Sequence, residues 1–169
     1  MAVSCCCNKS TVSENITDFY SCMVDGSYKK LFPNYESYVS KQVDRIKQRY
    51  IGGAVLSIGC GNGDIEAALP FSVVCYDIHD AAKILHPKLN FHHEWPAEKY
   101  DLVLCMGAVL PYIPYCKQKT FIKRLLNSTT ENGRVLMTGN HYTGDRSQNI
   151  VREYTYPTVT ISNSKIEVL

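Results

Sequence analysis

The sequence lacks the long apolar runs of a membrane protein. No apolar stretch approaches the roughly 20 residues that span a bilayer, so we expect no membrane association. The segment Met1 to Cys7 has neither a basic start nor a long apolar core, so no signal peptide is expected. A strong charge of one sign is also lacking, because the net charge at pH 7 is only +2. The charge balance therefore argues neither for nor against an anionic partner.

Cysteine pairs with metal-ligand spacing are missing as well. The chain holds 8 cysteines but no C-x-x-C pair, and the adjacent cysteines Cys5–Cys7 cannot easily share one tetrahedral ion, even with Cys22. We therefore expect no metal site. Cys75 and Cys105 fall in expected core strands, where a reduced cysteine packs as a small hydrophobe. Because such a core needs no disulfide framework, a reducing, cytoplasmic location is expected.

Length and composition are those of one globular domain. We expect a single domain over 1–169, made of an N-terminal helical extension (1–51) and a core (52–169). Within the extension, helices are expected over 11–24 and from Asn34 to about Tyr50. In the second of these, apolar residues recur near the 3.6-residue period, and Gly52-Gly53 end it.

From residue 54 onward, strand and helix patterns alternate. Strands are expected at 54–58, 72–76, 89–93, 101–105 and 134–138. Helices are expected from 64 to the proline at 70, around 80–85, and at about 117–129. The C-terminal stretches 151–161 and 165–169 look like a hairpin around 162–164, which would make the last strand antiparallel near one edge. The expected fold is α/β, with a seven-stranded, mostly parallel sheet and helices on both faces.

The most informative stretch runs from Ala54 to Glu66. Its apolar start, 54–58, suits a strand that is buried on both faces. Glycines then occupy alternate positions and let the backbone approach a ligand: Gly59, Gly61 and Gly63. A dinucleotide-binding turn needs its third glycine at position 64, where this chain has Asp64. The turn therefore predicts a nucleotide-like ligand but does not match the dinucleotide pattern.

Asp77 is the second informative residue. It stands at the carboxyl end of the second expected strand, where an acidic side chain can accept two hydrogen bonds from a ribose diol. An open α/β sheet binds its ligand at the carboxyl ends of its strands, near the switch in strand order. The glycine turn and Asp77 both fall at that edge. For Asp77 alone, the alternative interpretation is a polar loop residue at a strand end.

Two later segments extend the pattern. Residues 100–113 read YDLVLCMGAVLPYI, and residues 132–137 read NGRVLM. With the G-x-G-x-G turn and Asp77, they resemble the ordered motifs of the class I S-adenosylmethionine (SAM)-dependent methyltransferases over about 52–139. The entry to the fifth strand has one glycine where that family usually has two. The resemblance implies a Rossmann-like fold and SAM as the cofactor.

The resemblance also implies which residues contact SAM. The glycines of the turn would contact the methionine part of SAM, and Met106 and Gly107 would form the bottom of the pocket. Asp77 would hold the ribose hydroxyls, with Ile78 beside the adenine. The flat face of Trp95 either covers the base or is an ordinary core or rim aromatic. The implied cofactor-binding residues are Gly59, Cys60, Gly61, Gly63, Asp77, Ile78, Trp95, Met106 and Gly107.

One position departs from the family pattern. The first strand of these enzymes usually ends in an acidic residue two positions before the first glycine, and here that position is Ser57. A hydroxyl can order the turn but cannot pair with the SAM ammonium. The departure bears on cofactor affinity and leaves the expected fold unchanged.

The residues after the fourth expected strand narrow the choice of acceptor. Cys105 to Ala108 matches neither the D/N-P-P-Y loop of amino-methylating nucleic-acid enzymes nor a Pro-Cys nucleophile. A small-molecule or protein acceptor is favoured. An RNA cap guanine-N7 acceptor stays open, because residues 100–139 loosely resemble that family and Lys41, Arg45 and Arg49 share one helix face that could meet phosphates.

No catalytic residue is assigned, because methyl transfer is an in-line displacement in which positioning supplies most of the rate. The alternative from another class is a catalytically inactive methyltransferase-like module that binds or scaffolds. That alternative rests on the short chain, the early proline at 70 and Ser57.

Overall fold

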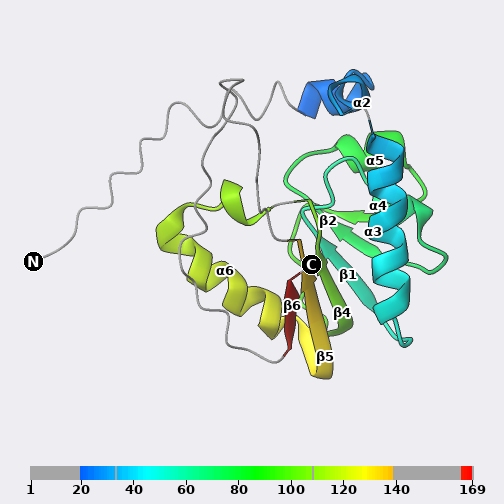
Figure 1. Ribbon diagram of the computed structural model, residues 1–169. Helices are drawn as coiled ribbons and strands as arrows, with labels where there is room; N and C mark the ends of the chain where they lie inside the picture. Colours follow the sequence, from blue (N-terminus) through cyan, green and yellow to red (C-terminus); the bar gives the residue numbers. More distant parts are fainter. Residues whose placement is uncertain (1–19, 33, 108, 139–164, 169) are drawn as a thin grey trace, which may run out of the picture.

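A computed structural model describes residues 20–32, 34–107, 109–138 and 165–168 (Figure 1). Residues 20–24 are helical. The further helices are α2 (Tyr28–Leu31), α3 (Tyr35–Arg49), α4 (Asp64–Ala68), α5 (Ala81–Leu85) and α6 (Tyr115–Asn127), with the 3-10 helix η1 (Leu110–Tyr112). The strands are β1 (Val55–Ile58), β2 (Val74–Tyr76), β3 (Asn90–His92), β4 (Tyr100–Cys105), β5 (Thr129–Met137) and β6 (Ile166–Val168).

The six described strands form one sheet in the order β3-β2-β1-β4-β5-β6. Every neighbouring pair runs parallel. The order reverses at β1, which pairs with β2 on one side and with β4 on the other. The two central strands are buried along almost their whole length, as the apolar runs in the sequence predict. The parallel α/β sheet expected from the sequence is therefore confirmed.

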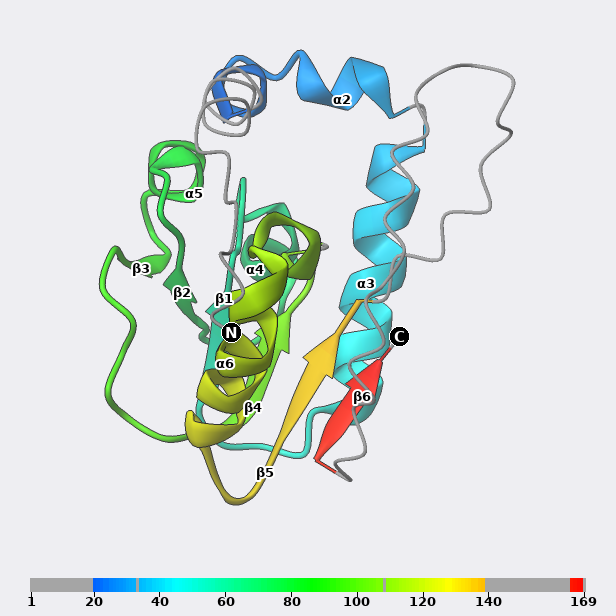
Figure 2. The same ribbon diagram turned by 90° about the vertical axis from the view of Figure 1, so that its left-hand side faces the viewer.

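Helices cover both faces of the sheet, as Figure 2 shows. One face packs against α3, α4 and α5 through Ile46, Ile65 and Ala82. The other face packs against α6 through Ile122 and Leu125. Because alternate residues of β1 point to opposite faces, Val55 joins the first core and Leu56 the second. The three-layer arrangement confirms the expectation of helices on both faces.

The C-terminal strand corrects one expectation. β6 lies at the edge of the sheet, as expected, but it runs parallel to β5, with Leu136 opposite Glu167. The antiparallel orientation was inferred from a hairpin whose first arm, 151–161, is the strand that would bring the number to seven; that arm lies outside the described residues. The chain from Met137 to Ile166 exceeds the dozen or so residues that a parallel crossover needs.

Helix and strand bounds differ from the sequence expectations by a few residues. Of the helix expected over 11–24, residues 20–24 are described and helical. α4 ends at Ala68, before the proline at 70, as expected. β5 starts at Thr129, earlier than expected, because Thr129 already pairs with Tyr100 before the register shifts between Tyr100 and Leu102.

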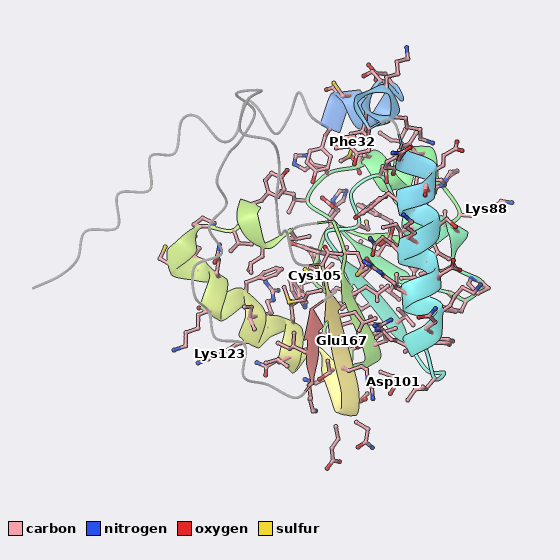
Figure 3. All side chains as sticks on the ribbon, in the orientation of Figure 1. Phe32, Lys88, Asp101, Cys105, Lys123 and Glu167 are labelled. Atoms are coloured by element: carbon pink, nitrogen blue, oxygen red, sulfur yellow. The ribbon has the colours of Figure 1, made fainter. Side chains whose placement is uncertain are left out.

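Asp101 joins the beginnings of three strands at the amino edge of the sheet (Figure 3). Its Oδ2 accepts a hydrogen bond from the amide of Ala54, at 2.9 Å. Its Oδ1 accepts one from the hydroxyl of Thr130, also at 2.9 Å. One carboxylate therefore satisfies donors just before β1 and in β5 from its own position in β4. This edge is opposite to the one where the strands end.

Replacing Asp101 with alanine is expected to lower the free energy of unfolding by about 2 kcal/mol, since two donors lose a charged acceptor. Chemical denaturation followed by circular dichroism measures the change. Glu131→Ala, at an exposed acid of the neighbouring strand, is the control and is expected to cost no more than about 0.5 kcal/mol. Equal costs for the two variants would show that Asp101 does not hold the strand starts together.

Candidate functional site

The glycine turn connects β1 to α4 at the carboxyl edge of the sheet. Gly59, Gly61 and Gly63 have φ values of 71°, 60° and 75°, in the left-handed region that favours glycine. The amide of Gly59 donates to the carbonyl of Tyr76, at 2.8 Å, which ties the turn to the end of β2. The three glycines therefore allow the left-handed backbone of the turn, and they also let a ligand approach that backbone closely.

Two glycines of the turn are packed tightly. A Cβ on Gly59 would lie 2.4 Å from Cγ2 of Val109, in the segment after β4. A Cβ on Gly63 would lie 2.9 Å from both Ala82 and Leu89. At Gly61 the nearest heavy atom to such a Cβ is the end of the Met23 side chain, at 3.8 Å. Gly61 is thus the member of the turn with room for a Cβ, in ordinary contact with Met23.

Asp77 lies directly against the turn, although the two are far apart in the sequence. Its side chain is only 2% exposed. Oδ2 accepts a hydrogen bond from the amide of Gly61, at 2.8 Å, and Oδ1 accepts one from the amide of His79, at 3.0 Å. Burial raises the pKa of Asp77, and these backbone hydrogen bonds only partly oppose the rise. Each carboxylate oxygen keeps a lone pair for a further donor.

The helix at 20–24 lies over this site. The Tyr20 ring stacks on that of His79, with 3.6 Å between centroids. Burial, followed by the charge of Asp77, raises the pKa of Tyr20. Nε2 of His79 is buried and has no hydrogen-bond partner among the described residues. Sequence analysis did not assign Tyr20, Met23 or His79 to the cofactor site, and only the position of His79 two residues after Asp77 pointed toward it.

A buried acid lies behind the turn. Ser57 is 1% exposed and Glu66 4% exposed, and the serine hydroxyl donates to Oε1 of Glu66, at 2.6 Å. Burial raises the pKa of Glu66 to about 7, even though the hydrogen bond from Ser57 favours ionisation. Sequence analysis singled out Ser57 and placed Glu66 at the helix start, but it did not pair them.

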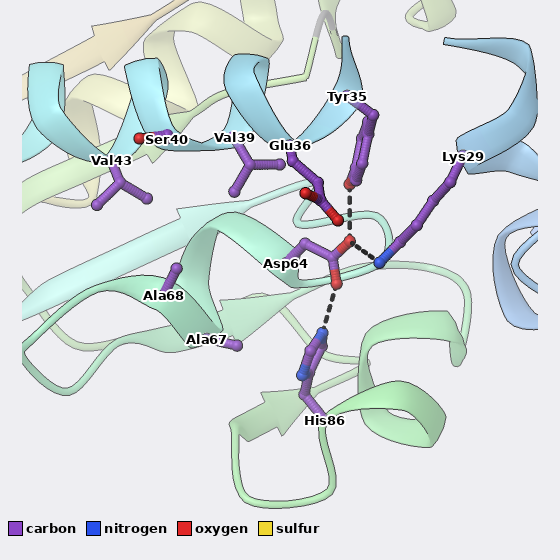
Figure 4. Close-up of a pocket in the computed structure, with 10 residues that line it drawn as sticks. All are labelled: Lys29, Tyr35, Glu36, Val39, Ser40, Val43, Asp64, Ala67, Ala68 and His86. Carbon is purple, nitrogen blue, oxygen red and sulfur yellow. Dashed lines mark hydrogen bonds and ion pairs between the residues drawn. The ribbon is translucent and has the colours of Figure 1, made fainter. Parts of the chain in front are cut away.

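Asp64, at the start of α4, connects the N-terminal helices to the core (Figure 4). Its carboxylate accepts a hydrogen bond from the Tyr35 hydroxyl, at 2.9 Å, and lies 3.5 Å from Nζ of Lys29. Its other oxygen lies 2.7 Å from Nε2 of His86. Partial burial opposes ionisation, but the hydrogen bonds from His86 and Tyr35 outweigh it, so the pKa of Asp64 is lowered. A cavity of about 590 Å³ beside this cluster is lined by α3 and α4, away from Asp77.

The other residues implied by the resemblance lie in varied settings. Cys60 and Met106 are buried, and Ile78 is 69% exposed at the sheet edge. A hydrogen bond with Cys75, together with burial, raises the pKa of the Cys60 thiol. The amide of Gly107 donates to the Thr138 hydroxyl. A Cβ on Gly107 would lie 3.9 Å from the carbonyl oxygen of Gly59, so the segment after β4 meets the turn.

Trp95 is the residue that the structure does not bring to the turn. Its Nε1 donates to the hydroxyl of Ser128, at 2.9 Å. Its ring contacts Tyr76 and Phe121, and the guanidinium of Arg124 lies 4.2 Å from its centroid. These are contacts with β2 and with α6 and its C-cap, as expected of a core or rim aromatic. Its role over a base stays a prediction.

Three further findings concern metal ligands, membrane-spanning helices and thiols among the described residues. Among them, no group of three or more His, Cys, Asp or Glu side chains could hold a metal ion. None of the described helices is both long and apolar enough to cross a membrane. Within the described part of the chain, Cys22, Cys60, Cys75 and Cys105 carry free thiols.

The fold is shared with solved methyltransferase structures. CalS10, an amino pentose methyltransferase from Micromonospora echinaspora solved with SAM, aligns with a TM-score of 0.53 at 15% identity, over 66% of this chain and 53% of its own. NodS, an N-methyltransferase from Bradyrhizobium japonicum solved with S-adenosylhomocysteine (SAH), has a TM-score of 0.58 at 16% identity, over 73% and 70%. The complex of DhpI with SAH has a TM-score of 0.58 at 17% identity, over 73% and 66%.

At these identities the similarity establishes the fold alone. It confirms the Rossmann-like, methyltransferase-type fold that the sequence resemblance implied. The chain spans 53% of CalS10 and 66% of DhpI, so it covers only part of their length. No protein-family model matches the chain, and no curated protein matches it significantly.

The different surroundings of Gly61 and Gly63 give a matched test of the turn. Gly61→Ala is expected to lower the free energy of unfolding by about 1 kcal/mol, the strain of a left-handed alanine. Gly63→Ala is expected to cost about 3 kcal/mol, because its Cβ also overlaps α5. Urea denaturation of both variants measures the difference. Similar losses in the two variants would contradict the packing of α5 against Gly63.

Proposed function

We propose that this protein is a SAM-dependent methyltransferase that binds SAM at the glycine turn and transfers its methyl group to an acceptor by in-line displacement. The observation that carries the proposal is the hydrogen bond between the Gly61 amide and the Asp77 carboxylate. This bond holds the glycine turn and the acid at the end of β2 together at the carboxyl edge, beside the switch in strand order. The methyltransferase-type fold supports the same ligand.

The residues around the turn fit SAM in three respects. Gly61 is half-buried and its nearest neighbour is the flexible end of the Met23 side chain, so its backbone can be reached by the methionine part. Asp77 keeps unused lone pairs on both carboxylate oxygens for the ribose hydroxyls. The unpartnered Nε2 of His79 offers a buried polar atom next to Asp77. We propose that the turn, from Gly59 to Gly63 and including Cys60, holds the methionine part.

The remaining contacts follow the family resemblance. We assign Ile78 to the edge of the adenine, since it is exposed beside Asp77, and Met106 with Gly107 to the floor of the pocket. Trp95 is kept as a candidate for covering the base. We further propose that residues 52–169 form the cofactor core and 1–51 the extension over it. Tyr20 and Met23, which already lie against His79 and Gly61, support that arrangement.

The chemistry that SAM supplies is a methyl group on a sulfonium, a good leaving group. The protein's part is to hold and orient the reactants and to exclude water. Asp77 and the turn would hold the cofactor from one side, and Tyr20, whose ring stacks on His79, would border it from the other. No base is required unless the acceptor loses a proton, so none is assigned.

For the acceptor we favour a small molecule or a protein. CalS10 is described as an amino pentose methyltransferase and NodS as an N-methyltransferase, which supports a small amine-bearing acceptor for the shared fold. An RNA cap guanine remains a candidate through the basic face of α3. One member of that face, Arg49, is already engaged by Glu167, at 2.6 Å, which weakens that candidate.

A catalytically inactive binding module is the second candidate. Tyr20 favours it, because its ring stacks on His79 next to the acid that would hold the ribose. A tyrosine that stays there would fill part of the cofactor site. For either function we propose a reducing, cytoplasmic setting, which the free thiols of Cys22, Cys60, Cys75 and Cys105 support.

Calorimetry with SAM tests the proposal. The wild-type chain is expected to bind, and Asp77→Asn is expected to bind about 30-fold more weakly, since a charged acceptor for two ribose hydroxyls is lost. Asp80→Asn is the control, an exposed acid three residues further on whose partner is His93, and it is expected to bind as the wild type does.

Absence of binding at millimolar SAM, or equal binding by wild type and Asp77→Asn, would contradict the proposed site. If binding holds, transfer of a labelled methyl group is measured with small amines and amino sugars, protein extracts and capped RNA. Binding without transfer to any of these favours the inactive module.

A further inference from the structure

Glu66 is a buried acid that the proposed mechanism does not use. It lies in α4, one hydrogen bond beyond the Ser57 hydroxyl, at 2.6 Å. Ser57 occupies the position in β1 where the family resemblance leads one to expect a carboxylate. The structure therefore places a carboxylate close to that position, but supplies it from the helix after the turn instead of from the strand before it.

The surroundings of Glu66 are acidic. Its strongest charged neighbours are Asp77, at the end of β2, and Asp64, in its own helix. The thiol of Cys60, in the glycine turn between them, is influenced by both Glu66 and Asp77. From α3, the Tyr38 hydroxyl is the titratable group that faces it. In the described part of the chain, no ion pair involves either Glu66 or Asp77.

We propose that Glu66 acts as a positioning and specificity residue that gives the floor of the glycine turn a negative charge, so that the site prefers the cationic SAM to its neutral demethylated product SAH. The inference rests on the proposed SAM site. Both ligands carry the ammonium, so the preference comes from the sulfonium, which only SAM carries and for which the buried pair of Glu66 and Asp77 would be the counter-charge.

The physical basis is the difference of one positive charge between SAM and SAH. In a desolvated site that charge interacts more strongly with a carboxylate than it does in water. Because the charge disappears during methyl transfer, the interaction stabilises bound SAM and favours release of the product; it does not stabilise the transition state. The expected effect therefore lies in the ratio of the two dissociation constants.

The preference depends on the protonation of Glu66. Burial raises its pKa to about 7 in the free protein, so the neutral form predominates below that value. A bound cation favours the ionised form, which lowers the pKa and releases a proton. Affinity for SAM is therefore expected to rise between about pH 6 and about pH 7.5, while affinity for SAH changes little.

Calorimetry of wild type and Glu66→Gln with SAM and with SAH is the test. The glutamine keeps an oxygen that can accept from Ser57, so the fold is expected to be retained. We expect Glu66→Gln to lose about tenfold in the preference for SAM over SAH and to lose the rise in SAM affinity with pH. The control is Glu36→Gln, at an exposed acid of α3. It is expected to keep both the preference for SAM and the rise in SAM affinity with pH.

The double variant Ser57→Asp with Glu66→Ser moves the carboxylate back to the strand while keeping an acid and a hydroxyl in contact. It is expected to restore the preference for SAM. If Glu66→Gln and wild type show the same SAM-to-SAH ratio and the same pH dependence, the role of Glu66 is overturned while the proposed function stands. If the wild type binds neither ligand, the proposed function fails and the inference fails with it.

Discussion

The hydrogen bond from the Gly61 amide to Asp77 is the contact on which the site depends. It fixes the path of the glycine turn relative to β2, and the bond from Gly59 to Tyr76 continues the same connection. Together the two bonds bring the backbone of the turn and the buried carboxylate of Asp77 into one surface at the carboxyl edge.

The N-terminal helices contact the same surface. Asp64 begins α4 directly after the turn and accepts from Tyr35 in α3 while lying close to Lys29 in α2. The helix at 20–24 then brings Tyr20 onto His79. Through these contacts the described residues 20–24, α2 and α3 are held against the carboxyl edge of the sheet.

Much of the fold was predictable, because long apolar runs and glycine turns are local signals. The buried strands β1 and β4, the turn and Asp77 all follow from such patterns. The direction of β6 did not follow, because strand orientation depends on a crossover and not on the strand's own residues. The pairing of Ser57 with Glu66 was hidden as well, since helix position predicts a dipole role for Glu66 and gives no sign of its burial.

The central claim is that one ligand site is built on the glycine turn and Asp77. Nuclear magnetic resonance of the labelled chain titrated with SAH tests it most directly, because each backbone amide reports separately. The account predicts that the largest shifts fall on the amides of 59–63 and 77–79, led by Gly61. Shifts confined to the cavity between α3 and α4, or no shifts at millimolar SAH, would contradict it.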